Sequence, residues 1–311
     1  MVKVEHTRPR VAVCLAAFNG LEWLPAQVES IFAQSHVDVT IFVSVDRSTD
    51  GTEMWVDARA KGEPRMVVLP HGEKFGGAAR NFFRLLREVD FSGFDYLSFA
   101  DQDDLWPIDK LHRAHEVLQL SGADAYSSNV TAFWPDGRVM PIEKSQPQRQ
   151  WDFLFEAAGP GCTYVLRRRL AVALQGVLNQ KWTSAQQVGL HDWFSYAFAR
   201  ASGFRWVIDD YAGMLYRQHE SNQVGVNQGW RAARHRASKV LSGWGLRQAA
   251  LIADLVGLGN DVFVKRWSGG GGRMGLLWLA CQASKCRRRR RDQVLFAISC
   301  LALCILDRRL T

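Results

Sequence analysis

Three carboxylates lie within a stretch of four residues, at Asp101, Asp103 and Asp104. Carboxylates this close repel one another and resist burial unless a positive charge lies between them. A hard divalent cation such as Mg²⁺ or Mn²⁺ would supply that charge, since it takes oxygen ligands and often shares them with substrate phosphates. The alternative is a solvated acidic turn in which Asp103 or Asp104 caps the helix that follows Trp106-Pro107.

Short apolar segments precede this acidic cluster and two other polar loops. Residues 10–17, 39–45 and 94–99 each have the composition of a buried strand. The first is followed by Asn19-Gly20, the second by the turn-rich segment Asp46–Thr52, and the third by the acidic cluster. Because the carboxyl ends of parallel strands meet at one edge of a sheet, we expect these three loops to converge on one crevice.

Apolar residues at helical spacing separate these strands, and a further strand is predicted at 66–69. The resulting β-α alternation, which ends with a helix near Ser121, indicates an α/β fold with a mostly parallel central sheet and flanking helices. Beyond this point the pattern is irregular. It predicts strands at 123–133, after Gly159-Pro160-Gly161 and at 206–209, helices at 167–178 and 191–201, and a loop at 141–150.

The charge of the 311-residue chain is unevenly distributed. Residues 229–311 hold 16 Lys and Arg against four Asp and Glu, whereas the rest of the chain is mildly acidic. A basic end of this kind indicates contact with a membrane or a nucleic acid. Contact with nucleic acid is the weaker alternative, because no RNA- or DNA-binding motif accompanies the arginines.

The six cysteines, at positions 14, 162, 281, 286, 300 and 304, have no spacing typical of a disulfide framework. Several alternate with apolar residues, so we expect free buried thiols, with a zinc site in the C-terminal group as the alternative. No apolar segment precedes the first strand, and we therefore expect a chain without a secretory signal that faces the cytoplasm.

Five stretches, taken in order, resemble glycosyltransferase family 2, which has the GT-A nucleotide-sugar-binding fold. They are Ala16–Gly20, Ser44–Thr52, Ala100–Trp106, His191–Trp193 and Tyr216–Asn222. Within the family, the chain looks most like the rhamnosyltransferases of bacterial surface polysaccharide biosynthesis, and the resemblance covers roughly residues 10–228. One difference lies at Asp46, where the family commonly has paired acids.

The resemblance implies a donor site built from the first three stretches and the last. Asp46 would accept a hydrogen bond from the N3–H of a uracil or thymine base, although a turn residue is its alternative role. Asp103 and His219 would hold the Mg²⁺ or Mn²⁺, while Asp104 either assists them or caps the helix. The implied nucleotide-sugar contacts are Ala17, Asn19, Asp46, Asp101, Gln102 and Arg217.

The resemblance also implies an acceptor site around the fourth stretch. Asp192 matches the acid that acts as catalytic base, taking the proton from an acceptor hydroxyl in a single displacement that inverts the anomeric carbon. Its alternative role is a helix N-terminal acid favoured by the macrodipole. His191 and Trp193 would shape the acceptor site, and for Trp193 a buried core position is the alternative.

The chain is expected to comprise a catalytic domain at 1–228 and a helical, basic C-terminal region at 229–311. Residues 294–306 form an apolar run of 13 residues. A bilayer-spanning helix takes about 20 residues, so this run is too short to cross one. Because the run lies next to the basic block Arg287–Arg291, we expect it to lie in the anionic leaflet of a membrane. The alternative is a helix that packs on the main domain and leaves the arginines in solvent.

These features together predict an inverting, metal-dependent glycosyltransferase, peripheral to the inner face of the cell membrane. The expected donor is dTDP-rhamnose and the expected acceptor a saccharide, lipid-linked or part of a growing surface glycan. One alternative is the same chemistry with a UDP-sugar of galactose or N-acetylglucosamine. Another is a catalytically silent, membrane-bound GT-A scaffold. Nucleic acid is not among the expected partners.

Overall fold

The computed structural model describes residues 8–219, 242–269 and 271–306. Its strands are β1 (Arg10–Ala17), β2 (Asp38–Val45), β3 (Met66–Val68), β4 (Tyr96–Asp101), β5 (Ala125–Phe133), β6 (Val139–Ile142), β7 (Val165–Arg167) and β8 (Trp206–Arg217). Its helices up to residue 219 are α1 (Leu24–Phe32), α2 (Thr52–Lys61), α3 (Ala78–Glu88), α4 (Lys110–Ser121), α5 (Arg168–Gln180), α6 (Trp182–Ala185) and α7 (His191–Ala201), with short 3₁₀ turns η1 (Asp152–Leu154) and η2 (Gly161–Thr163). The C-terminal helices are α9 (Trp244–Leu255), α10 (Val262–Ser268), α11 (Gly272–Cys281), α12 (Ala283–Cys286) and α13 (Arg290–Ile305).

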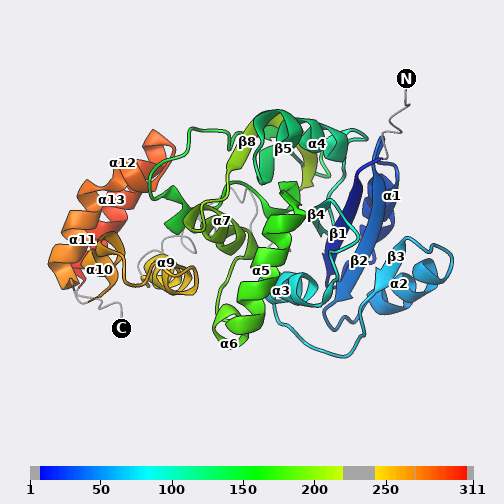
Figure 1. Cartoon of the computed structure of the whole chain (residues 1–311), viewed down its shortest axis with the longest axis horizontal. Helices are drawn as coiled ribbons and strands as arrows, with labels where there is room; N and C mark the ends of the chain where they lie inside the picture. The colour runs from blue at the N-terminus through cyan, green and yellow to red at the C-terminus, as the bar shows by residue number, and fades with distance from the viewer. Residues whose placement is uncertain (1–7, 220–241, 270, 307–311) are drawn as a thin grey trace, which may run out of the picture.

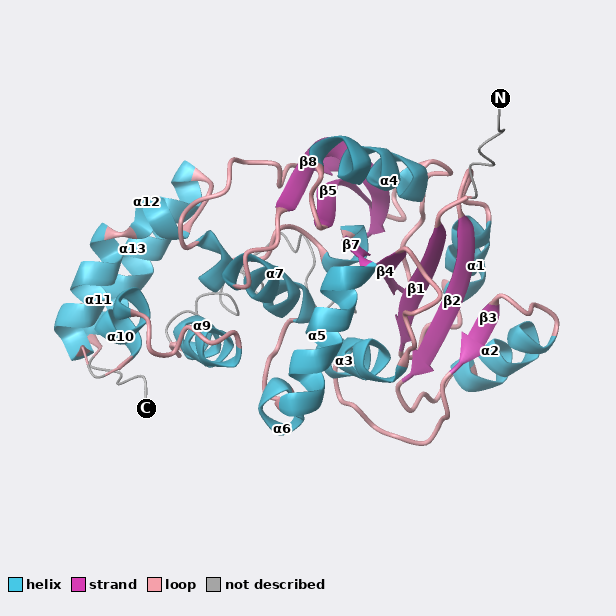
Figure 2. Ribbon diagram, in the orientation of Figure 1, coloured by secondary structure: helices cyan, strands magenta, loops and turns pink. Residues whose placement is uncertain are grey.

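The strands form one mixed sheet in the order β3-β2-β1-β4-β7-β5-β6, with β8 paired to β5 (Figure 2). Strands β1 to β4 are parallel, which confirms the α/β fold predicted from the alternation. The chain moves outward from β1 to β3 and then returns to place β4 on the other side of β1. In an open α/β sheet, ligands bind in the crevice at such a reversal, here between the carboxyl ends of β1 and β4.

The side chains of β1 point alternately to the two faces of the sheet, and both faces are covered by helices. Ala12, Cys14 and Ala16 face one hydrophobic cluster, which includes residues of α3, α5 and α7. Val11, Val13 and Leu15 face a second cluster, which includes residues of α1 and α4. Successive strand side chains point to opposite faces, so a run of apolar residues fits only a strand that is buried on both sides.

Several predicted boundaries were wrong. Helix α4 begins at Lys110, so neither Asp103 nor Asp104 caps it, and Asp109 occupies its N-cap position. Strand β8 extends to Arg217, far beyond the predicted end at 209, because its second half pairs with β5 after a bulge. The edge strand β6 spans residues 139–142 and so overlaps the start of the loop predicted at 141–150. Strand β7 runs antiparallel to both of its neighbours, β4 and β5.

The C-terminal helices share a hydrophobic core with the rest of the chain. Ile252, Trp267 and Leu279 belong to the same buried cluster as Leu154 and Phe194. Helices α10 to α13 lie at the end of the molecule farthest from β2 and β3 (Figure 1). The expected helical character of this region is found in its described part. The expected domain boundary at 228/229 lies outside the described residues. Within the described ranges, none of the helices combines the length and apolarity that crossing a bilayer requires.

Part of the basic block joins the C-terminal region to the main domain instead of facing solvent. The Arg288 side chain is buried, and its Nη1 lies 3.3 Å from Asp152 Oδ2 in η1. Asp152, which is fully buried, also accepts hydrogen bonds from Tyr196 and Arg200 of α7. One carboxylate therefore holds α7 and the start of α13 together, and the predicted solvated arginine patch is wrong for Arg288.

Replacing Asp152 with Asn should lower the free energy of unfolding by about 3 kcal/mol, because the buried guanidinium of Arg288 and the partly buried guanidinium of Arg200 lose the charge of this carboxylate. Chemical denaturation with the full chain would measure this loss. The matched control is Asp136→Asn, which removes an exposed ion pair with Arg138 and should cost no more than about 0.5 kcal/mol. Equal losses in the two variants would show that Asp152 does not lock these elements together.

Candidate active site

A cleft of about 1310 Å³ opens at the carboxyl ends of β1 and β4. It contains ten of the eleven residues that the sequence singled out: Ala17, Asn19, Asp46, Asp101, Gln102, Asp103, His191, Asp192, Trp193 and His219. The three loops expected to converge therefore do meet. The cleft continues past these residues to α9 and α13, an extension that was not predicted from the sequence.

The turn after β1 is fixed by side chains from neighbouring loops. Asn19 has a left-handed backbone with φ 46°, and its Oδ1 accepts a hydrogen bond from the Thr49 amide. The Gln102 amide group pairs with both the N–H and the C=O of Phe18. A Cβ on Gly20 would clash with the side-chain amide of Gln102, so a larger residue there would displace Gln102 from Phe18. Gln102 thus positions the loop that forms this wall of the cleft.

Asp46, directly after β2, organises a second loop. Its Oδ1 accepts hydrogen bonds from the Arg47 and Phe75 amides, and its Oδ2 accepts one from the Gly76 amide. These bonds hold the segment before α3 against the end of β2. A carboxylate oxygen can accept two hydrogen bonds, so Oδ2 retains an acceptor site beside the cleft.

The acidic cluster follows β4 and is largely withdrawn from solvent. Asp103 is buried and Asp104 is fully buried, while Asp101 is partly exposed at the end of the strand. Burial, reinforced by the charges of Asp103 and Asp192, raises the pKa of Asp101 to about 7. Burial and the two neighbouring aspartates also raise the pKa of Asp104. These carboxyls carry more negative charge than their surroundings can stabilise.

His219 reaches Asp103 from a distant part of the chain because β8 continues past its predicted end. Leu215 of β8 exchanges two backbone hydrogen bonds with Leu105, immediately after the acidic cluster. This pairing places His219 Nε2 2.6 Å from Asp103 Oδ2. The imidazole stacks on Trp23, with ring centroids 4.1 Å apart, which fixes its orientation.

The chemistry of this donor set suits a divalent cation. Asp101 and Asp103 offer carboxylate oxygens and His219 an imidazole nitrogen, all at the cleft. Lys110 lies near Asp104, but burial lowers its pKa to about 7 and its Nζ, which lies 3.5 Å from the centre of the Trp106 ring, forms no hydrogen bond among the described residues. Asp101, Asp104 and Cys162 form a second group of possible ligands, whose ligand atoms lie within 4.8 Å of one another. Asp104 Oδ2 is buried and has no hydrogen-bond partner among the described residues.

Asp192 lies in the first turn of α7 and lines the same cleft as the acidic cluster. Burial raises the pKa of Asp192 to about 6, against the lowering effects of the Trp193 amide and the Lys144 charge. Its Oδ1 accepts the Trp193 N–H at 2.7 Å. The Asp101 pKa responds to the Asp192 charge, which agrees with the shared placement of the two carboxyls in one cleft.

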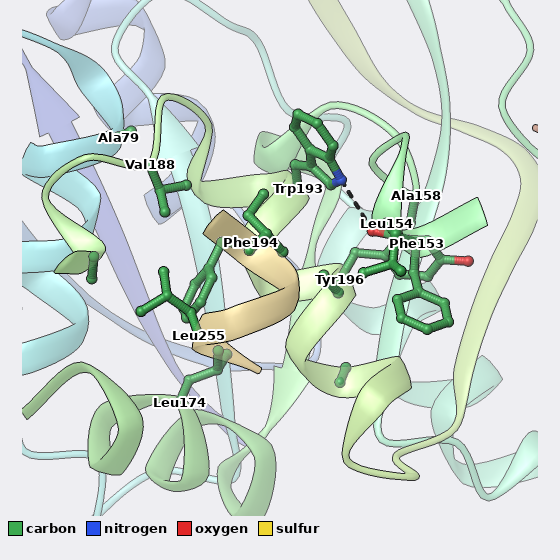
Figure 3. Packing of buried hydrophobic residues seen from close by; sticks show 14 of the residues in the cluster. Ala79, Phe153, Leu154, Ala158, Leu174, Val188, Trp193, Phe194, Tyr196 and Leu255 are labelled. Atoms are coloured by element: carbon green, nitrogen blue, oxygen red, sulfur yellow. Dashed lines mark hydrogen bonds between the residues drawn. The ribbon is translucent and has the colours of Figure 1, made fainter. Parts of the chain in front are cut away.

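The neighbours of Asp192 are mainly structural. Trp193 is buried, and its Nε1 donates to the Phe153 carbonyl at 3.0 Å within the hydrophobic core (Figure 3). His191 stacks on Phe82 at 3.9 Å, and burial lowers its pKa to about 3, so it is a neutral ring. Both residues line the cleft although they are largely buried, so Trp193 occupies the core position given as its alternative, and a role of the two residues in shaping an acceptor site stays a prediction.

Arg217 is the predicted site residue that does not line the cleft. Its Nε donates to the Asp103 carbonyl at 2.8 Å, its N–H to Asp104 Oδ1 at 3.3 Å, and its guanidinium lies over the Phe133 ring. It therefore positions the acidic cluster, and the predicted contact with a phosphate is not supported by this arrangement.

Other cleft residues were missed by sequence reasoning, chiefly Lys144, Trp244, Arg287, Arg291 and Leu295. They come from the loop after β6, from α9, from the link between α12 and α13, and from α13 itself. The basic block and the apolar run at 294–306 were the sequence signals that pointed to some of them.

Comparison with known proteins identifies a matching family and several relatives. The model of "Glycosyl transferase family 2" matches residues 12–169. The "dTDP-rhamnosyl transferase RfbG" of Shigella flexneri is 41% identical over 281 residues, which is 90% of this chain and 96% of the relative. The "Putative teichuronic acid biosynthesis glycosyltransferase TuaG" of Bacillus subtilis is 30% identical over 112 residues, or 36% of this chain and 42% of the relative.

Solved structures show the same fold at low sequence identity. S. aureus TarS 1–349 in complex with UDP-GlcNAc has a TM-score of 0.54 and 12% identity, covering 95% of this chain and 88% of that chain. The mannosyltransferase PcManGT from Pyrobaculum calidifontis, in complex with GDP-Man and Mn²⁺, has a TM-score of 0.52 and 17% identity, covering 97% and 88% of the two chains.

Proposed function

Since this chain belongs to glycosyl transferase family 2, we propose that it transfers rhamnose from dTDP-rhamnose to a saccharide acceptor with inversion at the anomeric carbon. It is a glycosyltransferase that uses a nucleotide-sugar donor. The observation that carries the proposed mechanism is one cleft lined by carboxylates from two distant parts of the chain, Asp101 and Asp103 after β4 and Asp192 at the start of α7. The choice of dTDP-rhamnose rests on the name of the Shigella flexneri relative.

The donor would bind where the loops after β1, β2 and β4 meet. The free acceptor site of Asp46 Oδ2 suits the imide N–H of a thymine base, while Ala17 and Asn19 border the same part of the cleft. Asp103 and His219, with Asp101, would hold a Mg²⁺ or Mn²⁺ ion. When bound, such an ion supplies positive charge beside the diphosphate that leaves.

Asp192 would act as the base in a single displacement. Its carboxylate takes the proton from an acceptor hydroxyl as that oxygen bonds to the anomeric carbon. The bond from that carbon to the diphosphate oxygen breaks, and the electron pair leaves with the diphosphate. In such a displacement the hydroxyl oxygen attacks from the face opposite the departing diphosphate, which inverts the carbon.

The rate should depend on pH through Asp192. Because burial raises its pKa to about 6, the active carboxylate form is present above that pH and is lost below it. We expect kcat/KM to fall about tenfold per pH unit below the pKa, measured from roughly pH 5 to pH 8. A kcat/KM that stays constant across this range, in an enzyme that remains folded, would contradict the assignment.

The proposed reaction can be tested by product analysis. The full chain would be incubated with isotopically labelled dTDP-rhamnose, Mg²⁺ and a lipid extract from bacterial membranes. We expect labelled lipid whose rhamnose linkage has the anomeric configuration opposite to that of the donor. Transfer with retained configuration would overturn the mechanism, and transfer only from a UDP-sugar would overturn the donor.

We also propose that α13 rests on an anionic membrane surface. Four aliphatic side chains at helical spacing form its outer row, namely Val294, Ile298, Leu301 and Ile305. Their exposed fractions run from 43% for Leu301 to 79% for Ile305, which is unusual for adjacent apolar residues on one helix face. The exposed Arg290 at the start of the helix adds the positive charge that an anionic leaflet attracts.

Replacing Ile298 and Ile305 together with Gln should weaken binding to phosphatidylglycerol vesicles about tenfold or more, because two aliphatic side chains no longer enter the apolar layer. Sedimentation with the vesicles would measure the partition. The matched control is Val172→Gln on α5, an exposed aliphatic residue of another helix, which should leave the partition unchanged. Equal binding by all of these proteins would exclude the outer row as a membrane contact.

A further inference from the structure

A turn with two glycines, at residues 159–161, brings a lysine from another part of the chain close to Asp192. A Cβ on Gly161 would lie 3.1 Å from the Cβ of Asp192. A Cβ on Gly159 would lie 3.6 Å from the Cβ of Lys144. The two side chains therefore pack against positions of the same turn that are two residues apart, and both line the cleft.

The glycine turn is held in place by the fully buried Tyr164. The Tyr164 hydroxyl donates to the Gly159 carbonyl at 3.2 Å and accepts a hydrogen bond from the Ala158 amide at 3.0 Å. The Tyr164 carbonyl accepts a hydrogen bond from the Ser98 hydroxyl of β4 at 2.9 Å. The turn is thus fixed to the strand that ends at Asp101.

The backbone of Lys144, which lies just after β6, is also fixed. Asn129 of β5 accepts hydrogen bonds from the Lys144 and Ser145 amides through its Oδ1. Asn129 Nδ2 donates to the Asp210 carbonyl of β8 at 2.8 Å. The Lys144 side chain therefore extends from a point that two strands hold.

No ion pair with a described residue neutralises the Lys144 ammonium, because the acids around it pair with arginines. Glu143 lies 3.7 Å from Arg289, and Glu156 lies 3.8 Å from Arg288. Burial is the main cause that lowers the pKa of Lys144. The charged groups that act on this pKa are Arg288 and Arg289, which lower it, and Glu156 and Asp292, which raise it.

Asp192 itself lies in surroundings that oppose its charge. Burial raises its pKa to about 6, the acidic Asp101 lines the same cleft, and the neighbouring His191 is a neutral ring. Burial and the Asp192 charge together raise the pKa of Tyr164. Against these effects, the amides of the turn and of α7 lower the pKa of Asp192, and Lys144 is the cation that does so.

We propose that Lys144 is a positioning residue for the base: packed against the same glycine turn, its ammonium holds Asp192 as a carboxylate that is ready to accept a proton. This inference rests on the proposed function, in which Asp192 is the base. Lys144 acts through Asp192 and needs no contact with either substrate. It explains how a carboxyl group that is buried beside other acids is ionised at neutral pH.

The first test measures the ionisation of Asp192 directly and does not depend on turnover. The full chain would be labelled with carbon-13 at the aspartate side-chain carboxyls and titrated by NMR, and the Asp192 signal is the one that Asp192→Asn lacks. Lys144→Met keeps the packing on Gly159 but removes the charge, so the midpoint should rise by about one pH unit. Lys144→Arg should keep the midpoint, as should the control Lys74→Met, which removes a lysine that lines the cleft beside Asp46.

The second test measures how kcat/KM for sugar transfer depends on pH. For Lys144→Met, kcat/KM should be about tenfold lower at pH 5 and should recover at pH 8 to within about twofold of the unsubstituted chain, because Asp192 is ionised there in both proteins. Lys144→Arg should follow the profile of the unsubstituted chain. A residue that only supports the fold would instead lower kcat/KM equally at every pH.

The outcomes separate this inference from the proposed function. An unchanged Asp192 midpoint in Lys144→Met, or an equal rise in Lys74→Met, would overturn the role of Lys144. If Lys144→Met does not fold, Lys144→Gln takes its place with the same expected rise. If the unsubstituted chain transfers no sugar at any pH, the proposed function fails, and the NMR titration still decides whether Lys144 holds the charge of Asp192.

Discussion

Replacing Asp192 with Asn should lower kcat about 1000-fold while donor binding stays unchanged, because general base catalysis typically contributes a factor of 10² to 10⁴. The amide has nearly the same shape as the carboxyl and can still accept the Trp193 N–H through its Oδ1. It cannot take a proton from an acceptor hydroxyl. Single-turnover rates with saturating donor would isolate this step.

The fold of this variant should be at least as stable as that of the unsubstituted chain. Burial raises the pKa of Asp192 to about 6, so the charged form is unfavourable in the folded state and a neutral amide relieves that cost. An unchanged or raised melting temperature, together with the lost rate, would separate chemistry from misfolding. A variant that keeps a tenth or more of the rate would exclude Asp192 as the base.

Replacing Asp103 with Asn should weaken Mn²⁺ binding by about 100-fold or more, since it removes the carboxylate ligand that lies 2.6 Å from His219. The electron paramagnetic resonance signal of free Mn²⁺, titrated with protein and dTDP, would measure this directly and does not depend on turnover. His219→Gln should weaken Mn²⁺ binding in the same direction.

The second possible ligand group provides the discriminating control. Cys162→Ser alters the group formed with Asp101 and Asp104, but leaves Asp103 and His219 in place. We expect it to bind Mn²⁺ as the unsubstituted chain does. Loss of Mn²⁺ binding in Cys162→Ser, with normal binding in Asp103→Asn, would place the ion in the other group.

The part of the site that could be predicted from sequence lies in loops that follow strands. The apolar runs at β1, β2 and β4 identify buried parallel strands, and the polar residues directly after them must then share an edge of the sheet. This argument brings Asn19, Asp46 and Asp101 together without knowledge of any long-range contact. It also explains why the α/β fold was predicted correctly.

The other residues of the site are placed by contacts between segments that are far apart in the sequence, and no spacing pattern predicts such contacts. The predicted strand ended at Asp209, yet Asp210 and Gly213 continue β8, in which Asp209 is paired with Arg113 and Tyr126. The position of His219 follows from that continuation. Similarly, five consecutive arginines resemble a solvated patch, and only the folded chain shows that Arg288 meets the buried Asp152.

The outer row of α13 was hidden for a further reason. Apolar residues occupy nearly the whole helix circumference, so periodicity cannot tell which face is buried, which lines a cleft and which is exposed. The packing of α11 and of the Asp152 network decides this, and both belong to other parts of the chain.

The measurement that tests the central claim most directly is a thermal-shift titration of the full chain with dTDP-rhamnose and Mg²⁺. A ligand that binds only the folded state, at 100 times its dissociation constant, stabilises it by about 2.7 kcal/mol. We predict a clear rise in melting temperature that requires the metal, exceeds the rise with UDP- or GDP-sugars, and disappears in Asp103→Asn. A folded chain whose melting temperature responds to none of these nucleotides would contradict the account, and a larger rise with a UDP-sugar would contradict its donor.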